Sequence, residues 1–205
     1  AGMLIEARSA KTLGATGKNI RAQIAHMGVK DTLLTISADA TAPLATMSQY
    51  LTASPVGARL GGAFNGANAA GDASLNLKLA IPLTGNKKTR VDGLLTFGNN
   101  AFDMHWPVPP LTNLNGKLRF TESGATSEKL TATALNAPVT ATVTTDENRR
   151  IRIEAQSRLA PDSVHFFVNT ELTKALTAYA KGQTDISVDI DIVSGKGCLL
   201  YTSDA

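Results

Sequence analysis

The sequence predicts an all-β fold of mainly antiparallel strands with two or three short helices. Three observations favour this class. Apolar side chains occupy every second position in many segments, which is typical of strands with one buried face. Short turns rich in Gly, Asn and Asp separate these segments, and links this short favour antiparallel meanders over βαβ crossovers. Threonine is abundant, which also favours strands.

The alternation is clearest in two segments. Residues 74–81 place Leu or Ile at odd positions and Ser, Asn, Lys or Ala between them. Residues 186–192 place Ile or Val at even positions and Ser or Asp between them. Shorter alternating runs predict further strands near residues 20–24, 34–36, 91–97, 102–106, 118–120, 139–143 and 151–155. We expect the turns between strands at residues 84–87, 98–100, 122–124 and 146–148.

Helices are predicted where the apolar spacing changes. Residues 44–51 and 162–180 carry apolar side chains near helical spacing, and each segment favours a helix. Asp162 or Ser163 is the expected N-cap of the second helix. Residues 56–64 form either a third short helix or an irregular turn.

The domain organisation follows from these helices. A glycine-containing turn and a strong strand follow each of the two longer helices, so we expect repeat units near residues 1–83 and 84–193. Both units belong to one elongated domain over residues 1–197. The last eight residues, 198–205, resemble a translated adapter sequence from DNA library preparation, and we interpret them as non-native. We therefore expect the chain to be a fragment.

Composition excludes several classes of protein. Hydrophobic residues make up 43% of the 205 residues and charged residues 18%, which argues against intrinsic disorder. No apolar run approaches the roughly 18 residues of a membrane helix. A net charge of +3 is too weak and too dispersed to indicate nucleic-acid binding. A single cysteine, Cys198, cannot form an internal disulfide or a zinc cage.

No catalytic constellation is recognisable. His26, His105 and His165 lie far apart, and none has the spacing of a metal site. Residues 14–19 lack the glycine and the Ser or Thr that a phosphate-binding loop requires, and no GxSxG motif is present. The aspartates of residues 185–191 share the polar face of one strand, as expected for a solvated surface. We expect no enzymatic activity, no cofactor and no metal.

The expected strands outnumber the helices that could cover their apolar face. Each exposed Leu, Ile or Phe forgoes roughly 1.5–3 kcal/mol relative to burial, and a monomer rarely leaves more than a few hundred Å² of contiguous apolar surface bare. The sheet therefore either closes on itself as a sandwich or barrel, or curls into a trough that holds an apolar ligand. The residue pattern alone leaves both architectures open.

A succession of motifs resembles the central region of YhdP-type proteins, a branch of the AsmA-like superfamily. The strongest is AGDASLNLKLAIPL at residues 70–83. Ile186 stands where the family pattern has Trp, and residues 136–138 replace an expected glycine-rich turn. The other motifs, which agree in order and spacing, lie at residues 3–10, 20–24, 42–44, 50–56, 91–93, 98–100, 109–111 and 114–124.

The resemblance implies a fold and a function. Such proteins are anchored in the inner membrane of Gram-negative bacteria and cross the periplasm. They form a long, twisted β-sheet trough whose apolar interior carries phospholipids toward the outer membrane. The resemblance therefore implies that this chain is a periplasmic stretch of such a trough. The anchor and both membrane contacts would lie outside it. Its expected partners are phospholipid acyl chains, and no nucleic acid.

The resemblance and the alternation together assign a groove lining. The predicted lining consists of Leu75, Leu77, Leu79, Ile81, Val91, Leu95, Phe97, Leu118, Phe120, Ile151, Ile153, Ile186, Val188, Ile190 and Ile192. Ordinary core packing is the alternative for each of these side chains. The corresponding alternative for the chain is a β-sandwich that serves as a binding or structural module of a secreted or surface protein.

Overall fold

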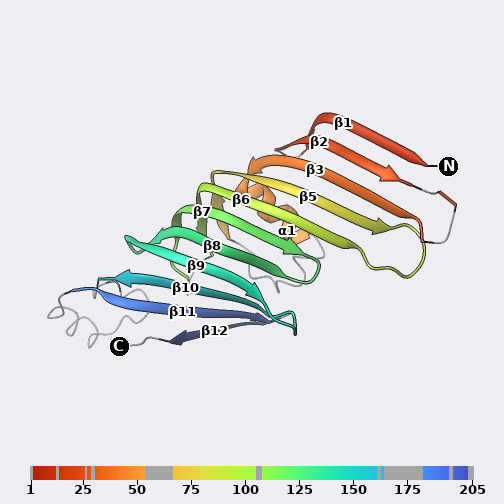
Figure 1. Ribbon diagram of the computed structural model, residues 1–205. Coiled ribbons are helices and arrows are strands. Elements are labelled where there is room, and N and C mark those ends of the chain that lie inside the picture. The colour runs from red at the N-terminus through yellow and green to blue at the C-terminus, as the bar shows by residue number, and fades with distance from the viewer. Residues whose placement is uncertain are drawn as a thin grey trace.

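Most of the described chain forms one β-sheet. The computed structural model describes residues 2–12, 14–25, 27–28, 31–53, 67–104, 108–160, 163, 182–193 and 196–202. Twelve strands of these residues form a single antiparallel sheet (Figure 1). The sheet is unclosed and curled, so the predicted all-β, mainly antiparallel fold is confirmed.

The strands are long and succeed one another along the chain. The elements are β1 (Met3–Thr12), β2 (Ala15–Ile24), β3 (Leu33–Pro43), α1 (Leu44–Ala53), β4 (Asn68–Ala70), β5 (Asp72–Pro82), β6 (Arg90–Asp103), β7 (Leu111–Thr121), β8 (Ala125–Ala134), β9 (Ala137–Thr145), β10 (Ile151–Leu159), β11 (Thr184–Val193) and β12 (Lys196–Thr202). Short links join most neighbours, as expected for a meander.

Strand order follows chain order almost throughout. The exception is the short β4, which follows α1 in the chain and pairs with the far end of β6. β3 therefore has β5 as its neighbour. β1 and β12 form the two edges of the described sheet. At a spacing of about 4.8 Å between neighbours, the main path from β1 to β12 extends over about 48 Å.

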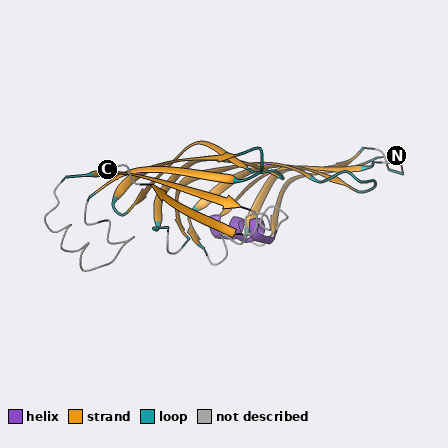
Figure 2. Cartoon of the chain, turned by 90° about the horizontal axis from the view of Figure 1, so that it is seen from below, coloured by secondary structure: helices purple, strands orange, loops and turns teal. Residues whose placement is uncertain are grey.

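One face of the sheet is concave and apolar. The sheet curls along its strands, and α1 lies inside the curve, in contact with β3, β4 and β5 (Figure 2). Ala42 and Ala73 are directly opposite each other in β3 and β5 and are only 3% and 2% exposed. Because side chains alternate along a strand, Ala73 shares its face with Leu75 and Leu77. The two buried alanines lie on the face that α1 contacts, which is the concave one. The leucines of β5 therefore lie on the concave face as well.

The compact core lies at one rim of this concave face. Most buried side chains belong to the strand ends on the side of the sheet where α1 lies. Ile24 is buried at the opposite strand ends, and Val143 lies on the concave face two residues from the opposite end of β9. The rim core consists of Ala42, Leu44, Ala73, Asn100, Leu114, Ala134, Ala137 and Leu159. Most of the remaining concave face is therefore left with partly accessible side chains.

Residues 98–100 do not form the predicted turn. β6 runs from Arg90 to Asp103 without interruption, and its pairing with β7 shifts between Phe97 and Asn100. This shift is a β-bulge, which bends a strand without ending it. Asn99 has a φ of 59°, a conformation that asparagine adopts more readily than most residues. The segment predicted near residues 102–106 is therefore, up to Asp103, the continuation of β6.

Asn100 holds the bulge against its neighbours. It is fully buried, and its Oδ1 accepts a hydrogen bond of 2.8 Å from the backbone N–H of Gly98. Its Nδ2 donates to the carbonyl oxygens of Ala70 at 3.2 Å and Asp72 at 3.1 Å. Gly71 has a φ of 86°, and a Cβ there would lie 2.8 Å from this Nδ2. One amide thus satisfies three backbone groups, one in the bulge and two on either side of Gly71.

The helix predictions have different outcomes. α1 confirms the helix predicted over residues 44–51. The segments predicted at residues 56–64 and 162–180 lie outside the described residues, except for Ser163. β12 includes residues 198–202 of the tail that we expect to be non-native.

Candidate functional site

The predicted lining residues share the concave face. They occupy alternate positions of β5, β6, β7, β10 and β11. Their side chains are all half-buried, except that for Ile192 the structure describes the backbone alone. None belongs to the rim core. The large aliphatic side chains are thus neither fully packed nor turned outward.

The strand register joins the two halves of this lining. Leu75, Leu95 and Leu118 are direct partners across β5, β6 and β7. A neighbouring row of direct partners runs from β3 to β11 without interruption. It consists of Ala42, Ala73, Phe97, Gly116, Leu130, Ala141, Ala155 and Val188. Directly opposed side chains lie on the same face of a sheet, so the apolar face is continuous from β3 to β11.

The prediction missed part of this face. Leu130, Val139, Val143 and Ala141 belong to it through their partners in β7 and β10. The alternation at residues 139–143 already indicated that Val139, Ala141 and Val143 share one face. β8 was not expected as a strand, because threonine and alanine dominate its sequence and its apolar alternation is interrupted.

The concave face is wide as well as long. β5 alone carries five apolar positions on it, from Ala73 to Ile81. At about 3.4 Å per residue these positions extend over about 27 Å along the strand. We call this surface between β3 and β11 the apolar groove. Among the described residues it is open along most of its length, because the contacts of α1 are concentrated on β3, β4 and β5.

The apolar groove contains one buried hydroxyl without a partner. Ser127 lies opposite Val143 on the concave face, and among the described residues its Oγ makes no hydrogen bond. A buried unsatisfied hydroxyl costs roughly 1–3 kcal/mol. Ser157, on the same face opposite Val139, instead donates to the carbonyl oxygen of Pro138 at 2.9 Å.

Ser127→Ala is therefore expected to raise the free energy of unfolding by about 1 kcal/mol. The matched control, Ser157→Ala, removes a hydrogen bond that is made and is expected to lower it by about 1 kcal/mol. Urea unfolding followed by circular dichroism measures both. A loss of stability in Ser127→Ala would mean that its hydroxyl is satisfied in solution.

The outer face of the sheet is polar and carries cross-strand ion pairs. Arg158 donates from Nε to Asp185 Oδ1 at 2.7 Å, and Arg152 from Nε to Asp191 Oδ1 at 2.9 Å. These pairs account for two of the aspartates that the sequence places on the polar face of β11. Leu94 is an apolar side chain on this polar face. It lies between Asn76 and Arg119 and is 36% exposed.

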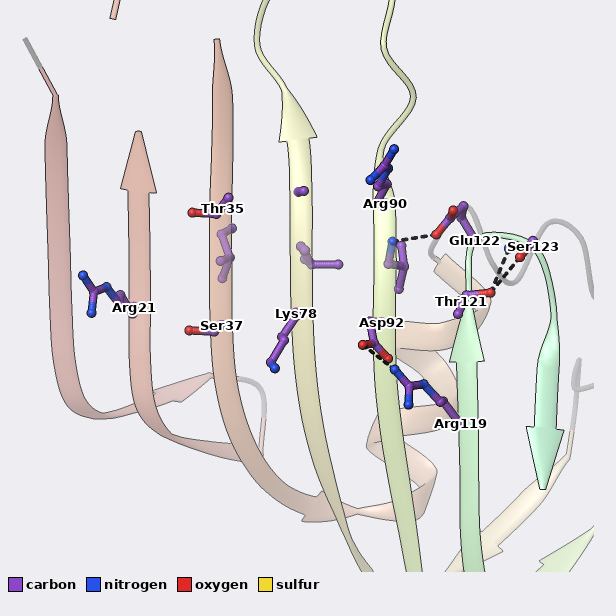
Figure 3. Close-up of a pocket in the computed structure, with 14 residues that line it drawn as sticks. Arg21, Thr35, Ser37, Lys78, Arg90, Asp92, Arg119, Thr121, Glu122 and Ser123 are labelled. Carbon is purple, nitrogen blue, oxygen red and sulfur yellow. Dashed lines mark hydrogen bonds and ion pairs between the residues drawn. The ribbon is translucent and has the colours of Figure 1, made fainter. Parts of the chain in front are cut away.

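A shallow hollow of about 540 Å³ lies on this outer face over β2 to β7 (Figure 3). Arg21, Ser37, Lys78 and Asp92 form one row of direct partners along it. Arg119 donates from a guanidinium nitrogen to Asp92 Oδ2 at 2.8 Å. The row faces away from the apolar groove, because it alternates with Ile36, Leu79 and Val91 in the same strands. The hollow is therefore part of the charged outer surface.

The two outer ion pairs make stability depend on pH. The hydrogen bond from Arg158 lowers the pKa of Asp185, and the hydrogen bond from Arg152 lowers the pKa of Asp191, from the ordinary value of 3.8. A carboxylate whose folded-state pKa is lowered stabilises the fold above its unfolded-state pKa. That contribution is lost as the pH falls through the folded-state value.

Acid is thus expected to lower the urea midpoint below about pH 4, where these carboxylates begin to take up protons in the unfolded chain. The double variant Asp185→Asn, Asp191→Asn is expected to have a shallower slope of midpoint against pH in this range. Unfolding curves at successive pH values measure it. An unchanged slope would mean that these pairs do not hold in solution. Salt should weaken the difference, since Arg152, Arg158 and Asp185 are exposed.

The described residues hold no metal-type cluster of His, Cys, Asp and Glu side chains. The three histidines lie outside them. Within the same part of the chain, no helix is long and apolar enough to cross a membrane.

The fold and the site define a class of protein: an elongated, open β-sheet with an apolar concave groove and a charged outer face. The chain matches the model of the YhdP protein family over residues 1–200 and belongs to that family. It is 32% identical over 137 residues to a protein of Escherichia coli (strain K12) named "Intermembrane phospholipid transporter YhdP". The match covers 67% of this chain and 11% of the relative's length. No solved structure matches the chain.

Proposed function

We propose that this chain forms one stretch of a groove that conducts phospholipids between the inner and outer membranes. The observation that carries the proposal is the continuous apolar face between β3 and β11, with its large aliphatic side chains half-buried rather than packed. The name of the E. coli relative, an intermembrane phospholipid transporter, supports phospholipid as the cargo.

Acyl chains would lie along the groove across the strands, while head groups stay in water above it. Each methylene moved from water to an apolar surface gains about 0.8 kcal/mol, so the lining attracts the chains without any specific contact. Rows of Leu, Ile, Val and Ala recur at every strand, about 4.8 Å apart. An acyl chain that slides by one strand therefore meets a similar surface, which keeps the barrier to its movement low. No covalent step is required.

The charged outer face suits an aqueous surrounding. Ion pairs such as Arg158–Asp185 are exposed, and they keep the strands soluble on the side opposite the cargo. A periplasmic location, in a protein anchored in the inner membrane by a part outside this chain, agrees with this arrangement and with the family. Contacts with both membranes would belong to other parts of that protein.

The β-sandwich alternative requires a second sheet facing the first. The described strands all belong to one sheet, so this alternative finds no support among them.

Native mass spectrometry of the purified chain tests the proposal. We expect a series of masses above that of the polypeptide, each shifted by one or more phospholipids that extraction and lipid analysis identify. A lipid-free mass together with high thermal stability would contradict it, because a closed, dry core would then account for the same residues.

A further inference from the structure

A phenylalanine ring lies flat on the floor of the apolar groove. Gly93 and Phe120 are directly opposite each other in β6 and β7, and Leu77 faces Gly93 from β5. A Cβ added to Gly93 would lie 2.5 Å from Cε1 and 2.6 Å from Cε2 of the Phe120 ring. The ring therefore occupies the space where a side chain of residue 93 would begin.

This arrangement determines how far the floor rises into the groove. Ring carbons that close to the position of a Cβ belong to a ring lying against the backbone, rather than one standing upright from the sheet. Gly93 is buried although it has no side chain of its own, while Phe120 is half-buried. Such pairing of an aromatic ring with a cross-strand glycine fills the gap that the glycine leaves in the sheet.

The same geometry allows only glycine beneath the ring. Real Cβ atoms essentially never come within 3.0 Å of another side chain, so any larger residue at position 93 must move the ring. The backbone of β6 is fixed on both sides by its pairing with β5 and β7. The ring must therefore leave its place against the backbone of β6, and the open side next to it is the groove.

We propose that Gly93 and Phe120 together set the depth of the groove where it crosses β5, β6 and β7. With glycine at position 93 the ring stays down and acyl chains pass over it. With a side chain at position 93 the ring stands up between Leu77 and Leu118 and obstructs the path. This inference rests on the proposed function, since it concerns the passage of acyl chains.

The test uses the full-length protein that contains this chain, with a photo-crosslinking amino acid in place of Leu95. Leu95 lies two residues from Gly93 on the same strand and the same face. In the otherwise unchanged protein we expect crosslinked phospholipid. Gly93→Ala is expected to reduce its yield several-fold. Adding Phe120→Ala to Gly93→Ala removes the obstructing ring and is expected to restore the yield.

The outcomes separate this inference from the proposed function. Absence of crosslinked lipid in the unchanged protein would overturn the proposed function. Lipid in the unchanged protein with an undiminished yield in Gly93→Ala, or no recovery in the double variant, would overturn the role of the pair alone. Thermal unfolding shows which variants fold. If Gly93→Ala does not fold, Phe120→Trp, which puts a larger ring over the same glycine, takes its place: a reduced yield supports the inference, and an undiminished yield overturns it.

Discussion

Leu77→Asp in the full-length protein is expected to block phospholipid passage and leave the sheet folded. Leu77 lies in the middle of the groove, opposite Ala38 and Gly93, and its half-buried side chain faces the open side. Without lipid, a carboxylate there remains in contact with water. An acyl chain that covers it must remove that water, and burying an unpaired carboxylate costs several kcal/mol. Leu118→Asp should act in the same way, since Leu118 lies in the next row.

Ser74→Asp is the matched control. Ser74 lies three positions from Leu77 on the same strand, but its exposed side chain is on the outer face. Transfer of labelled phospholipid is expected to be normal in this variant and absent in Leu77→Asp. Circular dichroism and thermal unfolding should be similar for both. If Leu77→Asp and Leu118→Asp simply unfold, the two positions are packed core and the groove assignment is wrong.

Asn100→Ala is expected to lower the free energy of unfolding by about 2–4 kcal/mol. The substitution leaves the N–H of Gly98 and the carbonyl groups of Ala70 and Asp72 without their hydrogen bonds. It also opens a cavity beside Gly71. No water has ready access, because the residue is fully buried.

Asn76→Ala controls for the loss of an asparagine on the same sheet. Asn76 is exposed, and it donates to Asp39 Oδ1 at 2.7 Å on the outer face, where water can replace the bond. Its effect should stay within about 0.5 kcal/mol. Urea unfolding compares the two variants. A change of the same small size in Asn100→Ala would mean that the bulge in β6 does not depend on this amide.

The strands were predictable because their signal is local. Leu75, Leu77 and Leu79 alternate with polar side chains, and this period of two is sufficient to predict both the strand and the apolar face. The bulge at residues 98–100 was not predictable in this way. Glycine and asparagine are typical of turns, whereas here Asn100 bonds to the distant carbonyl groups of Ala70 and Asp72 and the chain continues as β6.

The lining could be predicted strand by strand, but its continuity could not. β8 contributes Leu130 to the row that joins Phe97 to Val188, although its sequence does not alternate cleanly. The contact of Phe120 with Gly93 depends on the register between β6 and β7, which a bulge shifts further along the same pair. The curl that makes one face concave is a property of the whole sheet, and no single segment encodes it.

Photo-crosslinking at two neighbouring leucines tests the groove most directly. Leu95 faces Leu75 and Leu118 inside the groove, whereas Leu94 faces Asn76 and Arg119 on the outer face. The two positions share their strand and their residue type and differ in face. A photo-crosslinking amino acid at position 95 of the full-length protein is expected to capture phospholipid, and one at position 94 to capture none. Equal capture at both positions, or none at position 95, would contradict a lipid-conducting concave face.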